Sequence, residues 1–262
     1  MNDAGAPLNA ASPIGVFDSG VGGLSVLREL QALLPAEDFI YYADSAHCPY
    51  GGQSATAIQA RAVAITETLL AATCKLIVVA CNTATIAAVE SLRAAYPIAF
   101  VGMEPAVKPA CAQTRSGVVG VLATGAALAG EKFHHLIARH AGGVRVITQP
   151  CPGLVECVEA GELEGTRTQA LVQRYVEPLR AAGADVVVLG CTHYPFLRPL
   201  IQRVAGAQVA LIDTGAAVAR QAQRVLSREG LLRQDHAHAG TLQWLTSGDR
   251  AQLAPVVARL LG

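Results

Sequence analysis

Two cysteines stand where a thiol could act as an acid or a base. Cys81 follows the apolar run 75–80, Cys191 lies just after the apolar run 185–189, and hydrogen-bonding residues come directly after each. A thiol must become a thiolate to react, so a helix N-terminus or a cation has to lower its pKa from about 8.5. The turn from a strand into a helix offers that environment. The remaining cysteines are interpreted as small buried hydrophobes: Cys48, Cys74, Cys111, Cys151 and Cys157.

A histidine lies two residues beyond the second of these thiols. His193 could stabilise a thiolate at Cys191 or carry a proton to and from it, because the imidazole pKa lies near neutrality. Zinc is the rival explanation for a cysteine close to a histidine, but the chain has no paired C-x-x-C element. No metal site is therefore expected.

A glycine loop follows the first apolar run. Residues 14–17 lead into Asp18 and Ser19, which open the loop 20–23 (GVGG). No Gly-Lys-Ser/Thr follows, and Ser25 stands where a dinucleotide fingerprint needs its third glycine. Two interpretations remain: a tight turn that feeds a helix, or a cradle of backbone N–H groups for an anionic ligand.

Short apolar runs alternate along the chain with longer segments of helical periodicity. Near-continuous hydrophobicity in the short runs indicates strands covered on both faces, and alternation with helices is typical of parallel sheets. The expected strands cover 14–17, 39–43, 75–80, 98–102, 118–122, 144–148, 185–189, 209–212 and 242–246. The expected helices cover 24–34, 55–70, 85–96, 130–140, 165–182, 195–204, 216–227 and 249–261.

A weak internal sequence repeat predicts two similar α/β domains. Residues 75–83 (KLIVVACNT) are similar to 185–193 (DVVVLGCTH), and each is a buried strand that delivers a cysteine at its carboxyl end. Ligands of open α/β sheets bind just beyond such strand ends. We therefore predict an α/β protein with two similar parallel-sheet α/β domains that face each other across an active-site cleft. The predicted boundaries are 1–13 for a loose tail, 14–104 with 213–262 for the first domain (Cys81 side) and 105–212 for the second domain (Cys191 side).

Composition excludes several classes of protein. The chain has 262 residues, of which 52% are hydrophobic and 15% charged, so it is not intrinsically disordered. Its net charge is zero, which argues against a broad nucleic-acid surface. No apolar run reaches the 18 residues of a membrane span, and residues 1–13 do not read as a signal peptide. The odd number of cysteines, seven, indicates reduced thiols and a cytoplasmic protein.

Four segments of the chain resemble those of glutamate racemases, in the same order. They are 15–23 (GVFDSGVGG), 42–51 (YADSAHCPYG), 79–85 (VACNTAT) and 190–195 (GCTHYP), with flanking matches from about Ile14 to Asp249. The resemblance implies a cofactor-independent enzyme that interconverts L- and D-glutamate and supplies D-glutamate for bacterial peptidoglycan. It also implies a homodimer, with neither membrane nor nucleic acid as a partner.

The resemblance also implies roles for individual residues. Inverting an α-carbon by deprotonation needs one base on each face: Cys191 would deprotonate L-glutamate, and Cys81 would protonate the opposite face. Asp18 would assist Cys81, whereas His193 and Glu159 would assist Cys191. The residues implied to bind substrate are Asp18, Ser19, Pro49, Tyr50, Gly51, Asn82, Thr83, Thr124, Thr192 and His193. The family often has a second threonine where this chain has Ala127, so contact with the distal carboxylate would fall to Thr124 alone.

Three other functions are considered. An aspartate racemase of the same superfamily is the nearest, although such relatives tend to carry glutamate where this chain has His193. A binding or regulatory protein that kept the fold is the second, but both Cys81 and Cys191 are present. A redox protein that joins these two cysteines in a disulfide is the third.

Overall fold

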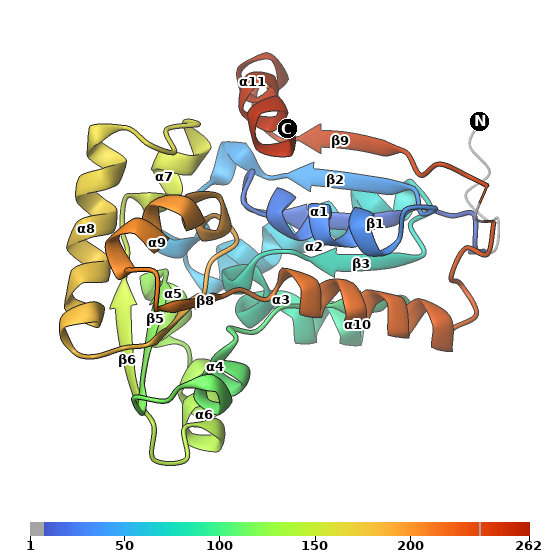
Figure 1. The fold of residues 1–262 in the computed structure, drawn as a ribbon. Helices are drawn as coiled ribbons and strands as arrows, with labels where there is room; N and C mark the ends of the chain where they lie inside the picture. Colours follow the sequence, from blue (N-terminus) through green and yellow to red (C-terminus); the bar gives the residue numbers. More distant parts are fainter. Residues whose placement is uncertain (1–7, 236) are drawn as a thin grey trace.

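The computed structural model describes residues 8–235 and 237–262, which form two parallel β-sheets with helices on both faces of each (Figure 1). The predicted fold class, two parallel-sheet α/β domains, is confirmed. The first sheet has the order β4 (Ala99–Val101), β3 (Leu76–Val79), β1 (Ile14–Asp18), β2 (Phe39–Ala43) and β9 (Leu242–Thr246). The second has the order β6 (Arg145–Pro150), β5 (Val118–Ala123), β7 (Val186–Leu189) and β8 (Ala210–Ile212).

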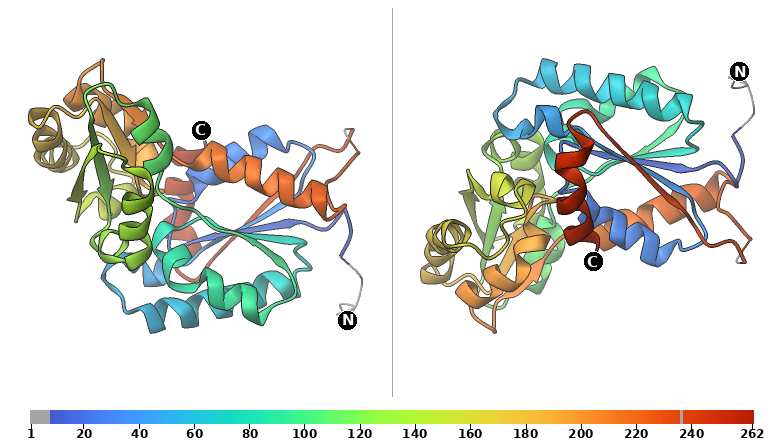
Figure 2. Two further views of the ribbon diagram at one scale, coloured as in Figure 1. Left: turned by 90° about the horizontal axis from the view of Figure 1, so that it is seen from below. Right: turned by 90° about the horizontal axis from the view of Figure 1, so that it is seen from above.

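Helices bury both faces of the first sheet, as Figure 2 shows. The strands β1 and β3 are buried along their whole length, which matches their unbroken apolar sequences. Phe17 and Ile77 pack against α2 and α3, whereas Val16 and Val78 pack against α1 and α10. The helices of this domain are α1 (Leu24–Leu33), α2 (Ala55–Ala71), α3 (Asn82–Ala95), α10 (Gly215–Arg228) and α11 (Arg250–Leu261).

The second sheet has the same layered construction. Val119 and Val188 face α4 and α6, whereas Leu122 and Val187 face α8 and α9. Gly183, with φ +85°, follows the end of α8 and lets the chain turn back into β7. The helices are α4 (Val107–Gln113), α5 (Gly125–Ala129), α6 (Glu131–His140), α7 (Leu154–Glu159), α8 (Thr166–Ala181) and α9 (Arg198–Ala205). Short 3₁₀ turns are η1 (Ser45–His47), η2 (Tyr50–Gly52) and η3 (Tyr194–Leu197).

Each sheet has one point at which its strand order reverses. In the first sheet it lies between β1 and β3, and in the second between β5 and β7. Ligands bind at such switch points, beyond the carboxyl ends of the strands. The arrowheads of β2, β3 and β9 point toward the second domain in Figure 1, so the switch point of the first sheet opens onto that domain.

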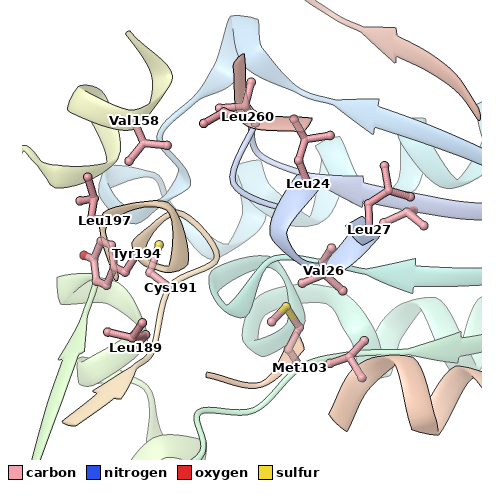
Figure 3. Close-up of a cluster of buried hydrophobic side chains, with 14 of the residues drawn as sticks. Leu24, Val26, Leu27, Met103, Val158, Leu189, Cys191, Tyr194, Leu197 and Leu260 are labelled. Atoms are coloured by element: carbon pink, nitrogen blue, oxygen red, sulfur yellow. The ribbon is translucent and has the colours of Figure 1, made fainter. Parts of the chain in front are cut away.

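An apolar cluster continues from one domain into the other. Leu24 and Val26 of α1 belong to the same buried cluster as Leu189 and Tyr194 of the second domain. In Figure 3, Leu189 and Tyr194 lie beside Cys191, Leu24 and Val26 lie across from them, and Met103 lies below Val26. The two domains therefore pack against each other through buried apolar side chains.

Most predicted elements are confirmed, with differences at particular ends. The strands at 39–43 and 242–246 agree residue for residue. The third helix begins at Asn82, three residues before the predicted start, because Cys81 caps it. The predicted helix over 195–204 divides into η3 and α9. The short helices α4, α5 and α7 were not expected, since five to seven residues carry little periodicity. No helix in the described part of the chain is long and apolar enough to cross a membrane.

A buried ion pair fixes the amino-terminal edge of the first sheet. Lys75 Nζ donates to Glu37 Oε2 at 2.5 Å, and both side chains are at most 2% exposed. Lys75 also donates to the carbonyl of Ala10, and Glu37 accepts from the amide of Arg233. Residues 8–13, the described part of the predicted loose tail, are thus held against the sheet at Ala10; residues 1–7 lie outside the described residues.

We predict that Glu37→Gln lowers the free energy of unfolding by about 3–5 kcal/mol, because it leaves the Lys75 ammonium buried without its charge partner. Urea denaturation followed by circular dichroism measures the change. The matched control is Glu229→Gln, which removes the exposed ion pair with Arg228 and should cost less than about 1 kcal/mol. Equal losses for the two variants would contradict the structural role given to the buried pair.

Candidate active site

Both predicted reactive cysteines lie at the switch points of the two sheets. Cys81 is the N-cap of α3, and its Sγ accepts a hydrogen bond from the Ala84 amide at 3.4 Å. Cys191 follows β7. The two residues are nearly buried, with 5% and 8% of their surfaces exposed. Both line one nearly closed pocket, whose free volume of about 20 Å³ is little more than the space of one water molecule.

The pocket gathers most of the residues that the sequence predicts for substrate binding. They come from the loops after strands of both sheets, and they are Ser19, Pro49, Tyr50, Gly51, Asn82, Thr83, Thr124, Thr192 and His193. Two predicted residues, Asp18 and Glu159, lie behind this wall and do not line the pocket. Each of them contacts a pocket residue instead.

Asp18 forms a buried hydrogen-bonded centre at the end of β1. Its carboxylate accepts hydrogen bonds from the amides of Ser19 (2.7 Å) and Gly23 (2.6 Å) and from the Thr192 hydroxyl (3.3 Å). The last of these bonds joins the two domains. Complete burial raises the pKa of Asp18, and the nearby His193 only partly opposes this effect. Burial, together with the charge of Asp18, also raises the pKa of Cys81 well above its usual range.

A chain of hydrogen bonds runs behind the second thiol. Cys191 Sγ lies 3.5 Å from His193 Nδ1, and His193 Nε2 lies 2.6 Å from Glu159 Oε1. Burial alone would lower the pKa of His193, but its bonds to Cys191 and Glu159 raise it well above 6.5. Burial alone would likewise raise the pKa of Glu159, but the bond to His193 and the amide of Val21 lower it. The pair is therefore an imidazolium and a carboxylate at neutral pH.

The two sulfur atoms have different neighbours. Burial and the charge of Asp18 raise the pKa of the Cys81 thiol. Cys191 Sγ lies instead beside a ring nitrogen of His193, a group that can exchange a proton with a thiol.

The glycine loop does cradle anions, but they are carboxylates of the chain itself. The amide of Val21 donates to Glu159 Oε1 at 2.7 Å, and the amide of Gly23 donates to Asp18 Oδ2. A Cβ atom on Gly20 would lie 2.0 Å from Glu159 Oε1, and one on Gly22 would lie 2.3 Å from His193 Nδ1. Only residues without a side chain allow the loop to approach the second domain so closely.

A second polar cluster, which sequence reasoning missed, fixes the loop that carries Tyr50. The Tyr50 hydroxyl donates to Asp44 Oδ2 at 2.5 Å, and Arg61 donates to both oxygens of the same carboxylate at 2.9 and 2.8 Å. Asp44 is completely buried. It directly follows β2, and its position at a strand end was the signal that could have revealed it.

The pocket also contains an unused acceptor and a link across the domains. Asn82 Oδ1 is buried and has no hydrogen-bond donor in the described part of the chain. The hydroxyl oxygens of Thr83 and Thr124 lie 3.2 Å apart, and Thr124 caps α5. An open acceptor beside several hydroxyl groups is suited to a ligand that carries both an ammonium and a carboxylate group.

The chain matches the family model described as Asp/Glu/Hydantoin racemase over residues 14–222. It is 62% identical to the glutamate racemase of Herpetosiphon aurantiacus, across 93% of this chain and 96% of that protein. The chain belongs to the glutamate racemases of this family. It is therefore an isomerase that acts as an amino-acid racemase.

Solved structures of this family share the fold of the enzyme. Escherichia coli glutamate racemase in complex with L-glutamate and the activator UDP-MurNAc-Ala has a TM-score of 0.81 and 35% identity, covering 95% of each chain. Francisella tularensis glutamate racemase in complex with D-glutamate has a TM-score of 0.81 and 28% identity, covering 96% of this chain and 94% of that one. The two-domain architecture of the enzyme is thus that of its relatives.

Ala127, where the resemblance implies a second threonine, is a buried residue. The side chain of Ala127 is 1% exposed and does not line the pocket, but its amide donates to Thr124 Oγ1 at 3.3 Å. Position 127 therefore contributes a backbone group that orients Thr124, and the substrate pocket keeps the Thr124 hydroxyl.

We predict that Gly22→Ala lowers kcat/KM for glutamate racemisation by about 100-fold, because the new Cβ displaces the His193 ring from between Cys191 and Glu159. The rate is measured by circular dichroism of the amino acid. Gly165→Ala is the matched control, since a Cβ at that position meets nothing within 4 Å. If the two variants racemise glutamate equally well, the close approach of the loop has no catalytic importance.

Proposed function

We propose that the enzyme interconverts L- and D-glutamate without a cofactor, using Cys191 and Cys81 as its two bases. The observation that carries this proposal is the placement of both sulfurs on the wall of one small pocket, each at the switch point of a different sheet. The different neighbours of the two sulfurs, Asp18 at Cys81 and His193 at Cys191, support it further.

The reaction begins with Cys191 as thiolate and Cys81 as thiol. The Cys191 sulfur takes the Cα proton of L-glutamate, and the electron pair stays on the substrate, shared between Cα and its carboxylate. The Cys81 thiol then gives its proton to the opposite face of Cα. The product is D-glutamate, with Cys191 protonated and Cys81 ionised, and this form of the enzyme is ready for the reverse reaction. Each step moves one proton and needs no oxidant or reductant.

The surrounding polar groups hold the substrate and stabilise the carbanion. Asn82 Oδ1 is the acceptor for the α-ammonium group, because no group of the described chain uses it. Ser19, Thr83 and Thr192 hold the α-ammonium and carboxylate groups from the wall of the pocket. Removing one such preorganised donor typically costs about 3 kcal/mol of transition-state stabilisation. The distal carboxylate is assigned to Thr124, which lies on the second domain.

Three supporting groups keep the two sulfurs in unlike forms. Asp18 assists Cys81 from behind the pocket wall, where its charge disfavours a second anion. His193 assists Cys191 by direct contact, and Glu159 holds the ring in place. Asp18 and Glu159 are therefore positioning residues and need not touch the substrate.

Two related enzymes support glutamate as the substrate. One glutamate racemase has been solved in complex with L-glutamate and another in complex with D-glutamate. We assign to the enzyme the supply of D-glutamate for peptidoglycan, a cytoplasmic location and a homodimeric state, with the domain boundaries predicted above. All seven cysteines are free, which fits a reducing compartment.

We predict that Cys81→Ala and Cys191→Ala each lower kcat/KM for glutamate by about 100-fold to 10,000-fold, because each removes the proton-transfer group on one face of Cα. Racemisation of L- and D-glutamate is followed by circular dichroism with no added cofactor. The loss must be equal in both directions, since the two isomers have equal free energy.

The matched control is Cys111→Ala, which removes a half-buried thiol outside the pocket and should keep the wild-type rate. Wild-type turnover of aspartate in preference to glutamate would overturn the substrate assignment. Full activity of either active-site variant would overturn the two-thiol assignment.

A further inference from the structure

A third thiol lies beside the active site without a part in the proposed reaction. Cys48 stands between η1 and η2, in the loop that carries Tyr50. Its Sγ, a carboxylate oxygen of Glu159 and a ring nitrogen of His193 all lie within 4.8 Å of one another. Among the described residues, this is the one group of three possible metal-ligating side chains that come so close together.

From this cluster we infer that Cys48, Glu159 and His193 form an inhibitory binding site for a thiophilic divalent cation such as Zn²⁺. One thiolate, one imidazole and one carboxylate are the three ligand types that zinc takes from proteins. The proposed racemase reaction needs no metal ion at this site. That the bound cation inhibits turnover rests on the function proposed above.

The geometry needs only small movements. Tetrahedral zinc with bonds of about 2.0–2.3 Å holds its ligand atoms roughly 3.3–3.8 Å apart. The Glu159 and His193 atoms, now 2.6 Å apart, would separate by about 1 Å, and the Cys48 sulfur, at most 4.8 Å from either, would approach by no more than about 1.5 Å. The three ligands come from the loop after β2, the end of α7 and the loop after β7, so nearby side chains can adjust independently.

Charge balance also favours the replacement of two protons by one Zn²⁺ ion. Zinc binds cysteine as a thiolate and histidine through an unprotonated ring nitrogen. Binding of Zn²⁺ releases the thiol proton and the Nε2 proton of His193. Two positive charges leave and two arrive, so the buried cluster keeps its net charge and its carboxylate stays paired.

The bound cation would stop the reaction in two ways. It would break the hydrogen bond between His193 and Glu159, which supports the charge next to Cys191. It would also join the Cys48 loop, which follows a strand of the first sheet, to α7 and the loop after β7 of the second. Opening of the pocket for substrate exchange would then be restricted.

Metal binding is tested with Zn²⁺ in a competition titration against a chromophoric chelator, and with Co²⁺ as a spectroscopic probe. Wild-type enzyme should bind one equivalent of Zn²⁺ per chain, and Co²⁺ should give a thiolate charge-transfer band. Cys48→Ala should weaken Zn²⁺ binding by at least about 100-fold and remove the band, since even the loss of an outer-sphere partner costs 10–100-fold. Cys111→Ala is the matched control and should bind as wild type. Glu159→Gln, which preserves side-chain shape, should also weaken binding.

Racemisation is then measured with and without buffered free Zn²⁺, and each variant is compared with its own metal-free rate. We expect inhibition of the wild type that EDTA reverses, and a half-inhibitory Zn²⁺ concentration at least about 100-fold higher for Cys48→Ala. Unchanged binding or inhibition in Cys48→Ala would overturn the site, as would a Co²⁺ band that disappears in Cys81→Ala instead. If the wild type does not racemise glutamate, the proposed function fails while the titration and the spectrum still judge the cation site. If it racemises glutamate but binds no Zn²⁺, the cation site alone fails.

Discussion

The hydrogen bond between His193 and Glu159 is the interaction on which the site depends most. It holds a positive ring against the sulfur of Cys191 inside a pocket that excludes most water. A buried imidazolium would be costly without a carboxylate partner, and the amide of Val21 completes the environment of that carboxylate. In the proposed mechanism this charge separates the two thiols into a base and an acid.

The fold supplies the two halves of this arrangement from different sheets. Asp18 ends β1 and Cys81 follows β3 at the switch point of the first sheet, while Thr124 and Cys191 follow strands at the switch point of the second. The glycine loop after β1 then spans the gap, because its amides reach carboxylates in both domains. The short distances at Gly20 and Gly22 show how little space separates the loop from the second domain. The site is therefore a property of the domain contact rather than of either sheet alone.

Much of this architecture could be predicted from the sequence. Valine-rich strands such as 185–189 and the repeated strand-to-cysteine pattern indicated two parallel sheets, and the order of motifs indicated the family. The start of α3 was missed because cysteine is an uncommon N-cap, and α7 was missed because it has only six residues. The contacts of Asp44 and Cys48 could not be predicted, since their partners lie far away in the sequence or belong to the other domain. Local pattern identifies which residues end a strand, but not which distant side chain meets them.

The central claim is that two sulfurs act on opposite faces of one carbon, and solvent exchange tests it most directly. L-Glutamate is converted in deuterium oxide, and both isomers are isolated before one tenth of the substrate has reacted. The mechanism predicts that the D-glutamate formed carries deuterium at Cα, since the Cys81 proton comes from solvent, while the remaining L-glutamate keeps its hydrogen. Substantial transfer of the original hydrogen to D-glutamate would show that one group serves both faces, and would contradict the account.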